Sequence, residues 1–431
     1  MTSAMIWILV AVVVYLLGML AIGFKYANNS TSEDFYLGGR KLGPIVTAMS
    51  TEASDMSAYL LMGVPGLAFF CGVAEAGWTA IGLALGTYLN WLIVAKRLRR
   101  YSAGINAITV PDFLARRFRD NTKIIETLGA LTVIIFFVPY TASGFAACGK
   151  LFNSLFGFDY MTAMIISAAV IVIYCATGGF MAASVTSLIQ GIVMTIALVI
   201  VLIFGINTAG GWDAVIANAK EIPGYLDFSA STSILTGTPS SYSPLMIAST
   251  LAWGLGYFGM PHILVRYLSI KSEHEMRKSQ IIGCSWIVLI LAMSAVVGLI
   301  GRQFLGEIDN ENLVFVHMVR RLFPAFISGV LLSAILAAAM STADSQLLAS
   351  SSAFASDIYK PVIRKDATDH EMQWAGRIIV ILISIVAFFI AADPNCGGIM
   401  ALVECAWAGF GSAFGPVILL SLYWRRLTYS G

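Results

Sequence analysis

One apolar stretch of the sequence carries carboxyl side chains in its middle. The segment STEASDMSAYL (residues 50–60) holds Glu52 and Asp55 among three serines and a threonine. A carboxylate at the centre of a membrane helix costs about 2.5–3.5 kcal/mol, so a retained one usually faces a cavity or a partner. Glycine and proline follow in GVPG (residues 63–66). The pattern predicts a locally unwound helix whose carbonyl oxygens line a cavity. Glu52 is equally compatible with a buried acid that orients this stretch.

A second polar cluster lies in AAAMSTADSQL (residues 337–347). Ser341, Asp344 and Ser345 are spaced i, i+3 and i+4, so their oxygens share one helix face, with Thr342 beside it. Hydroxyl, carbonyl and carboxylate oxygens are the ligands that hard cations prefer. Close helix packing alone explains Ser341 and Thr342, but it does not require a carboxylate. The two stretches together predict a cation site within the membrane.

A third irregular segment is WGLGYFGMPH (residues 253–262), which contains three glycines and a proline that break helices. Trp253 and Tyr257 are four residues apart and share a face, so they offer aromatic surface to a small organic solute. The alternative is an aromatic belt at the membrane interface, and it applies better to Trp253 than to Tyr257.

The elements that position these residues are predicted to be membrane helices. Of the 431 residues 58% are hydrophobic and only 12% are charged, and the mean hydropathy is +0.83, values typical of a membrane protein. Apolar runs long enough to cross a bilayer predict about eleven spans. They lie near residues 5–24, 44–70, 76–95, 124–147, 161–178, 184–206, 244–262, 280–301, 326–348, 373–392 and 398–423.

The basic residues predict how the spans are oriented. Lys and Arg concentrate after the odd-numbered spans, as in the segment 96–123 and in the predicted loop with Arg266 and Lys271. Because cytoplasmic loops collect these residues, the N-terminus is expected outside and Gly431 inside, in a multi-pass cell-membrane protein. The net charge of +2 is explained by this bias, and no nucleic-acid partner is expected.

The spacing of the two irregular spans predicts an internal repeat. The second and seventh spans are five apart, so they cross in opposite directions, and broken helices at corresponding positions of inverted repeats mark a transporter's central site. The expected all-α fold has one leading helix followed by five plus five. Its parts are a leading helix with a cytoplasmic loop (1–43), the first repeat (44–206), an extracellular loop (207–243), the second repeat (244–423) and a cytoplasmic end (424–431).

Motifs along nearly the whole chain resemble those of the solute:sodium symporter family, and within it most closely those of the sodium/proline symporters. They are EASDMSAYLLMGVPG at 52–66, AITVPDFLARRF at 107–118, YCATGGFMA at 174–182, WGLGYFGMPHIL at 253–264, LLSAILAAAMSTADSQLL at 331–348 and AWAGFGSAFGPV at 406–417. The resemblance implies a five-plus-five inverted-repeat fold and sodium-coupled uptake of a small solute, with L-proline as the first expectation.

The resemblance also implies site residues. The sodium ligands would be the carbonyl oxygens of Ala53, Met56 and Ala338 and the hydroxyls of Ser341 and Thr342, with Asp55 nearby. The solute would be held by Ser57, Tyr140, Trp253, Tyr257 and Pro261.

The sequence departs from the family pattern in three places. Ser187, in VTS, stands where many relatives have the Asp of a WTD motif that helps to hold a second sodium ion, so one ion is expected. Asp344 with Ser345 could restore a second ion site. Met260 stands where a proline-specific relative has Gln. Relatives usually have thirteen spans, against about eleven here.

Other readings stay open. The solute could be another small amino acid or a carboxylate. Proton coupling through Asp55 or Asp344 is the main rival, because carboxylates also serve proton relays. A channel would need a polar file along several spans, whereas these polar groups cluster at one depth. An enzyme is not expected, because Ser341 with Asp344 lacks a histidine to complete a nucleophilic site.

Overall fold

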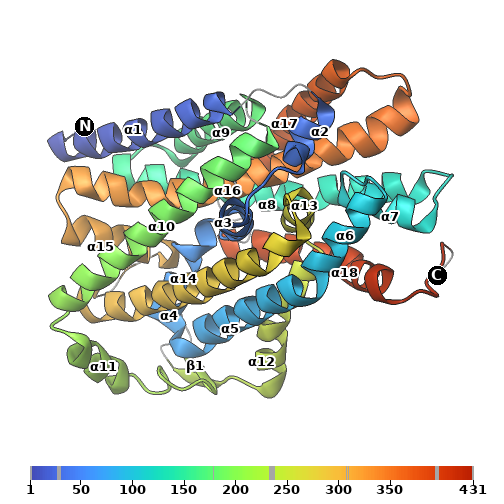
Figure 1. The fold of residues 1–431 in the computed structure, drawn as a ribbon. Coiled ribbons are helices and arrows are strands. Elements are labelled where there is room, and N and C mark those ends of the chain that lie inside the picture. Colours follow the sequence, from blue (N-terminus) through green and yellow to red (C-terminus); the bar gives the residue numbers. More distant parts are fainter. Residues whose placement is uncertain are drawn as a thin grey trace.

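The computed structural model describes residues 2–26, 31–177, 179–232, 238–306, 308, 310–393 and 398–429, and these residues are mostly helical (Figure 1). Within them, eight helices are long and apolar enough to cross a membrane, and one further pair passes the same test together but is bent by 73°. Two shorter apolar helices cover Tyr160–Ile173 and Pro244–Phe258. This confirms a multi-pass membrane protein. The total of eleven spans stays a prediction, because these two helices are short for a bilayer.

The N-terminal half of the chain is built from helices alone in its described part. They are α1 (Ser3–Lys25), α2 (Ser32–Leu37), η1 (Gly38–Arg40), α3 (Pro44–Asp55), η2 (Ala58–Leu60), α4 (Gly63–Cys71), α5 (Val73–Leu89), the π-helix η3 (Asn90–Ala95), α6 (Lys96–Gly104), α7 (Val110–Phe118), α8 (Ile124–Phe156), α9 (Tyr160–Thr177) and α10 (Phe180–Thr208).

The C-terminal half adds one small sheet to further helices. Its elements are α11 (Trp212–Glu221), β1 (Ala230–Thr232), β2 (Pro239–Ser241), α12 (Pro244–Leu251), η4 (Ala252–Phe258), α13 (Pro261–Ser269), η5 (Glu273–Glu275), α14 (Met276–Leu305), η6 (Glu311–Leu313), α15 (Val314–Leu322), α16 (Ala325–Phe354), the π-helix η7 (Ala355–Ile363), α17 (Asp369–Ala391) and α18 (Gly398–Tyr423).

The first broken span runs through α3 and α4. Pro44 opens α3, where a proline is well placed because its missing N–H would have no helical partner. The helix ends at Asp55, and Met56 leaves the helical region with φ −73° and ψ 77°. Ser57 is extended and caps η2 by accepting a hydrogen bond from the Tyr59 amide. The predicted unwinding of this segment is confirmed.

The second broken span runs through α12, η4 and α13. The chain passes through seven residues of 3₁₀-helix, and Pro261 opens α13 after Met260 adopts an extended conformation. Gly254 lies so close to α5 that a Cβ atom on Gly86 would collide with the Gly254 backbone, and one on Gly254 would collide with the Gly82 carbonyl oxygen. The predicted break is also confirmed.

The helix α16 lies at the centre of the bundle and packs against α1, α3, α8 and α10 (Figure 1). Of its most apolar window 78% is buried, against 22% for α1. A helix buried on nearly all sides can keep polar side chains only if other protein groups satisfy them. The polar cluster of α16 is therefore surrounded by protein and not by lipid.

The segment 207–243, which was predicted to be an outer loop, contains local structure. It holds α11 and a two-stranded antiparallel pair in which Ser231 lies opposite Ser240. The Tyr225 hydroxyl donates to the carbonyl oxygens of Ala68 and Phe69, at 2.5 and 3.0 Å, which fastens the segment to the end of α4.

Candidate functional site

The middle of α16 meets the end of α3 through one serine. The Ser341 hydroxyl lies 2.8 Å from the Ala53 carbonyl oxygen and 3.1 Å from the Ala338 carbonyl oxygen, and donates toward both. All three residues are fully buried. The structure therefore brings together three of the predicted sodium ligands, which come from two helices far apart in the sequence.

The other two predicted ligands lie next to this contact in the sequence. Thr342 is 2% exposed, and within the described part of the chain its hydroxyl oxygen has no hydrogen-bond partner. Met56 has left the helix, so its carbonyl is released from the regular helical pattern. Buried polar groups normally have partners, so an orphaned hydroxyl next in the chain to Ser341 and its carbonyl partners fits a hard cation such as Na⁺. Among the described residues no group of three His, Cys, Asp or Glu side chains could hold a metal.

Asp55 connects the two broken spans. Its carboxylate accepts a short hydrogen bond from the Tyr257 hydroxyl, and its backbone carbonyl oxygen lies 3.3 Å from the Tyr140 hydroxyl, which donates to it. Asp55 is fully buried, and its second carboxylate oxygen has no partner among the described residues. Tyr257 was predicted to bind the solute, yet it directly contacts the residue predicted to favour the ion.

Trp407 of α18 is the common neighbour of the predicted solute residues, and the sequence reasoning missed it. Its indole nitrogen lies 3.3 Å from the Tyr140 hydroxyl and donates to it. Its ring packs edge-on against Tyr257, with centroids 4.9 Å apart, and stacks on Trp253 at 6.0 Å. The available signal was a tryptophan among the small residues of AWAGFG, a segment that also contains Phe410.

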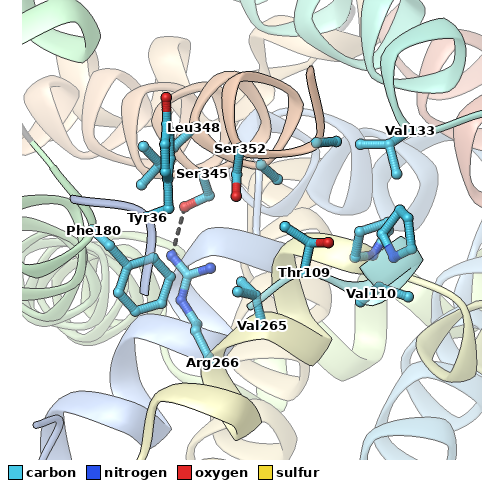
Figure 2. A pocket seen from close by; sticks show the side chains of 14 residues that line it. Tyr36, Thr109, Val110, Val133, Phe180, Val265, Arg266, Ser345, Leu348 and Ser352 are labelled. Atoms are coloured by element: carbon cyan, nitrogen blue, oxygen red, sulfur yellow. Dashed lines mark hydrogen bonds between the residues drawn. The ribbon is translucent and has the colours of Figure 1, made fainter. Parts of the chain in front are cut away.

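The remaining predicted solute residues lie on either side of this aromatic group. The Ser57 side chain hydrogen-bonds with Tyr140 and so belongs to it. Pro261 instead lines a cavity of about 20 Å³, with room for about one water molecule. Figure 2 shows this cavity, which lies between α13, α16 and the segment that leads into α7.

A buried arginine lies at the edge of this cavity (Figure 2). Arg266 is 2% exposed and donates to the His262 carbonyl oxygen at 2.5 Å, to Ser345 Oγ at 2.6 Å and to Ser50 Oγ at 3.3 Å. The prediction that Arg266 lies in a basic loop was wrong, because α13 continues to Ser269. Its guanidinium instead ties α13 to α3 and α16.

The residues predicted for a second ion lie beside this guanidinium. Ser345 accepts its hydrogen bond and donates to the Ser341 carbonyl oxygen at 2.7 Å. Asp344 is 4% exposed and interacts electrostatically with Arg266. The fixed positive charge of Arg266 repels a second cation at Asp344 and Ser345. Ser187 is buried on α10, one turn before Gly191, and Gly191 packs on Ala53.

Glu52 and Met260 are both buried next to the breaks. Glu52 is 1% exposed, and its Oε1 atom accepts a hydrogen bond of 2.7 Å from the Trp91 indole of η3. This bond fixes α3 to the neighbouring span, which is the orienting role considered for Glu52. Met260 is fully buried immediately before α13, so its side chain lies inside the protein at the second break.

The chain is similar to known transporters along nearly its whole length. The sequence profile described as "SSF: Sodium:solute symporter family" matches residues 35–431. The osmoregulated proline transporter of Bacillus subtilis is 42% identical over 431 residues, which cover 98% of this chain and 85% of that protein. A sodium/proline symporter of Salmonella typhimurium is 41% identical over 433 residues, covering 98% and 84%.

A solved structure of a Na⁺-coupled sialic acid symporter, substrate-bound and outward-open, superposes with a TM-score of 0.81. It covers 98% of this chain and 88% of that one at 18% identity, so it supports the transporter fold alone. The matched family consists of transporters, which confirms that the chain is not an enzyme. The chain belongs to the sodium:solute symporter family.

Proposed function

We propose that this protein couples the entry of Na⁺ to the uptake of L-proline across the cell membrane. The observation that carries the proposal is the hydrogen bond between Tyr257 and Asp55, which joins the two broken spans beside the Ser341 contact. The names of the relatives support proline as the solute. Na⁺ is the coupling ion of the family.

In this proposal one Na⁺ lies between α3 and α16. Its ligands are the carbonyl oxygens of Ala53, Met56 and Ala338 together with the hydroxyls of Ser341 and Thr342. Ser341 already reaches two of these carbonyls, so a small shift of its hydrogen bonds leaves an oxygen cage. Asp55 supplies negative charge without having to touch the ion. A single ion is favoured, because Arg266 lies beside the alternative pair Asp344 and Ser345.

Proline would bind where the aromatic side chains gather. Its apolar ring fits against Tyr257, Trp253 and Trp407, and its polar groups can reach the hydroxyls of Ser57 and Tyr140. Pro261 contributes the start of α13. Because Asp55 contacts Tyr257 and Tyr140 and directly precedes Met56 in the chain, binding of the ion and of the solute would reinforce each other, and such coupling is reciprocal.

The topology follows from the distribution of basic residues. We place the N-terminus outside and assign residues 44–206 and 244–423 to two inverted repeats that rock around the site. At about 100 mV and a roughly tenfold sodium gradient, one ion supplies about 2.3 plus 1.4 kcal/mol, which allows accumulation of a few hundred-fold.

The test is uptake of labelled L-proline into proteoliposomes under an inward sodium gradient, and separately under a proton gradient alone. We expect accumulation that requires sodium and survives collapse of the proton gradient. Accumulation driven by protons alone would instead assign the coupling role to Asp55 or Asp344. Sodium-driven uptake of other amino acids or small carboxylates, but not of proline, would refute the substrate assignment.

A further inference from the structure

A groove of about 350 Å³ lies between α12, η4 and α18. Trp253 and Ser249 line one wall, and Glu404, Trp407 and Ser412 line the other. Glu404 and Trp407 are three residues apart on α18, so their side chains lie on the same face, one turn from each other. The groove therefore presents a carboxylate next to two indole rings.

The groove adjoins the proposed solute site. Trp407 is 3% exposed, and while it lines the groove its indole also packs on Tyr257 and hydrogen-bonds to Tyr140. Both tyrosines contact Asp55. A single indole thus stands between the groove and the hydroxyl groups around Asp55.

The charge of Glu404 is not needed by any contact that the structure describes. The side chain is exposed, and none of the ion pairs among the described residues includes it. The nearby indole rings of Trp253 and Trp407 are close to parallel, with an interplanar angle of 30°. Indole faces and a carboxylate both attract an organic ammonium group, and together they repel an anion.

We propose that this groove is an additional binding position for small amines that carry an apolar ring, and that it shares Trp253 and Trp407 with the proposed solute site. The solute would wait there, with its ammonium group at Glu404, before it passes Trp407. This inference rests on the proposed function. It makes Glu404 a specificity-determining residue that admits zwitterions and cations and excludes anions.

The experiment uses inhibition of sodium-driven uptake of labelled proline in proteoliposomes. The probes are L-prolinamide, a cation that keeps the ring and amine, and N-acetyl-L-proline, an anion that lacks the ammonium group. We expect Glu404→Gln to weaken inhibition by prolinamide about fivefold, since a partly exposed ion pair contributes up to about that factor. The anion should inhibit the wild type weakly and Glu404→Gln more strongly, because the variant lacks the carboxylate that repels it. The sodium half-saturation concentration should not change.

Two further variants test position against charge. Glu404→Asp should restore prolinamide inhibition. Glu404→Gln combined with Cys405→Glu keeps the net charge but moves the acid about 100° around the helix, and it should not restore inhibition. Unchanged inhibition in Glu404→Gln, or full restoration by the moved acid, overturns the site.

Failure of the proposed function gives a different result. If the wild type takes up no proline, calorimetric titration of the purified protein with prolinamide tests the groove without transport. Binding that is weakened by Glu404→Gln then supports the groove, and equal binding to both proteins overturns it.

Discussion

Removing one hydroxyl group should separate the electrostatics of the ion site from its packing. Tyr257→Phe keeps the aromatic ring against Trp407 but deletes the donor that Asp55 accepts from. The Asp55 carboxylate is fully buried, and its other oxygen already lacks a partner among the described residues. The variant therefore leaves the side chain of this buried carboxylate without a described donor. We expect weaker binding of sodium with little change in the fold.

The size of the change in sodium affinity follows from the protonation state of Asp55 that the Tyr257 hydrogen bond stabilises. Sodium gains from Asp55 only while the carboxylate is ionised, and the Tyr257 hydroxyl stabilises that form more than the neutral acid. A hydrogen bond to a charged group contributes about 1.5–3 kcal/mol. Nearly all of it should be lost from ion binding, so the sodium half-saturation concentration should rise about ten- to hundredfold.

The assay is initial proline uptake at a series of sodium concentrations in proteoliposomes. Tyr59→Phe is the matched control, because its hydroxyl is also buried but donates to Met56 Sδ at 3.3 Å and not to Asp55. A sodium half-saturation concentration in Tyr257→Phe within twofold of this control would refute the reasoning. A full truncation is simpler: Tyr257→Ala also removes the ring that packs on Trp407, so it should weaken solute binding.

Three further perturbations have defined outcomes. Thr342→Ala should raise the sodium half-saturation concentration in the same uptake assay while Thr342→Ser does not, because only the alanine variant loses the orphaned hydroxyl. Gly86→Ala should sharply lower the amount of folded protein on immunoblots of membranes, because its methyl group would collide with the Gly254 backbone. Burial would raise the pKa of Asp120, but local hydrogen bonds, including one from the Ile125 amide at 2.8 Å, lower it below the usual 3.8. The stabilisation that Asp120 provides to the folded protein is therefore present above about pH 4 and is lost in more acidic solution. Asp120→Asn should lower the free energy of unfolding by about 1 kcal/mol at neutral pH, and its melting temperature should fall less than that of the wild type as the pH is lowered.

Local sequence was enough to predict both breaks in the helices. Polar density with glycine and proline cannot form a regular lipid-facing helix, so the segments around Asp55 and Gly254 had to unwind. The shared face of Ser341 and Ser345 also followed from helical spacing alone. In each case the controlling interactions lie within a few residues of one another in the chain.

Contacts between breaks could not be predicted in the same way. The bond from Tyr257 to Asp55 joins residues 202 positions apart and depends on how far each broken helix turns. Arg266 looked like a loop residue because a basic side chain is rarely buried, and only the oxygens of three different helical segments make its burial tolerable. For Trp407, the sequence shows only that a tryptophan lies in a membrane span. Its role follows from the residues that surround it in the structure.

The break after Asp55 has a consequence for how this protein can be altered. Three of the five proposed sodium ligands are main-chain carbonyls, from Ala53, Met56 and Ala338, and no codon change can remove a carbonyl. Side-chain substitutions in the aromatic wall can therefore reshape the solute specificity while much of the ion cage persists. To change the transported solute while keeping the sodium coupling, Trp253 and Met260 are the positions to vary. The glycines and prolines that break the two spans should be kept.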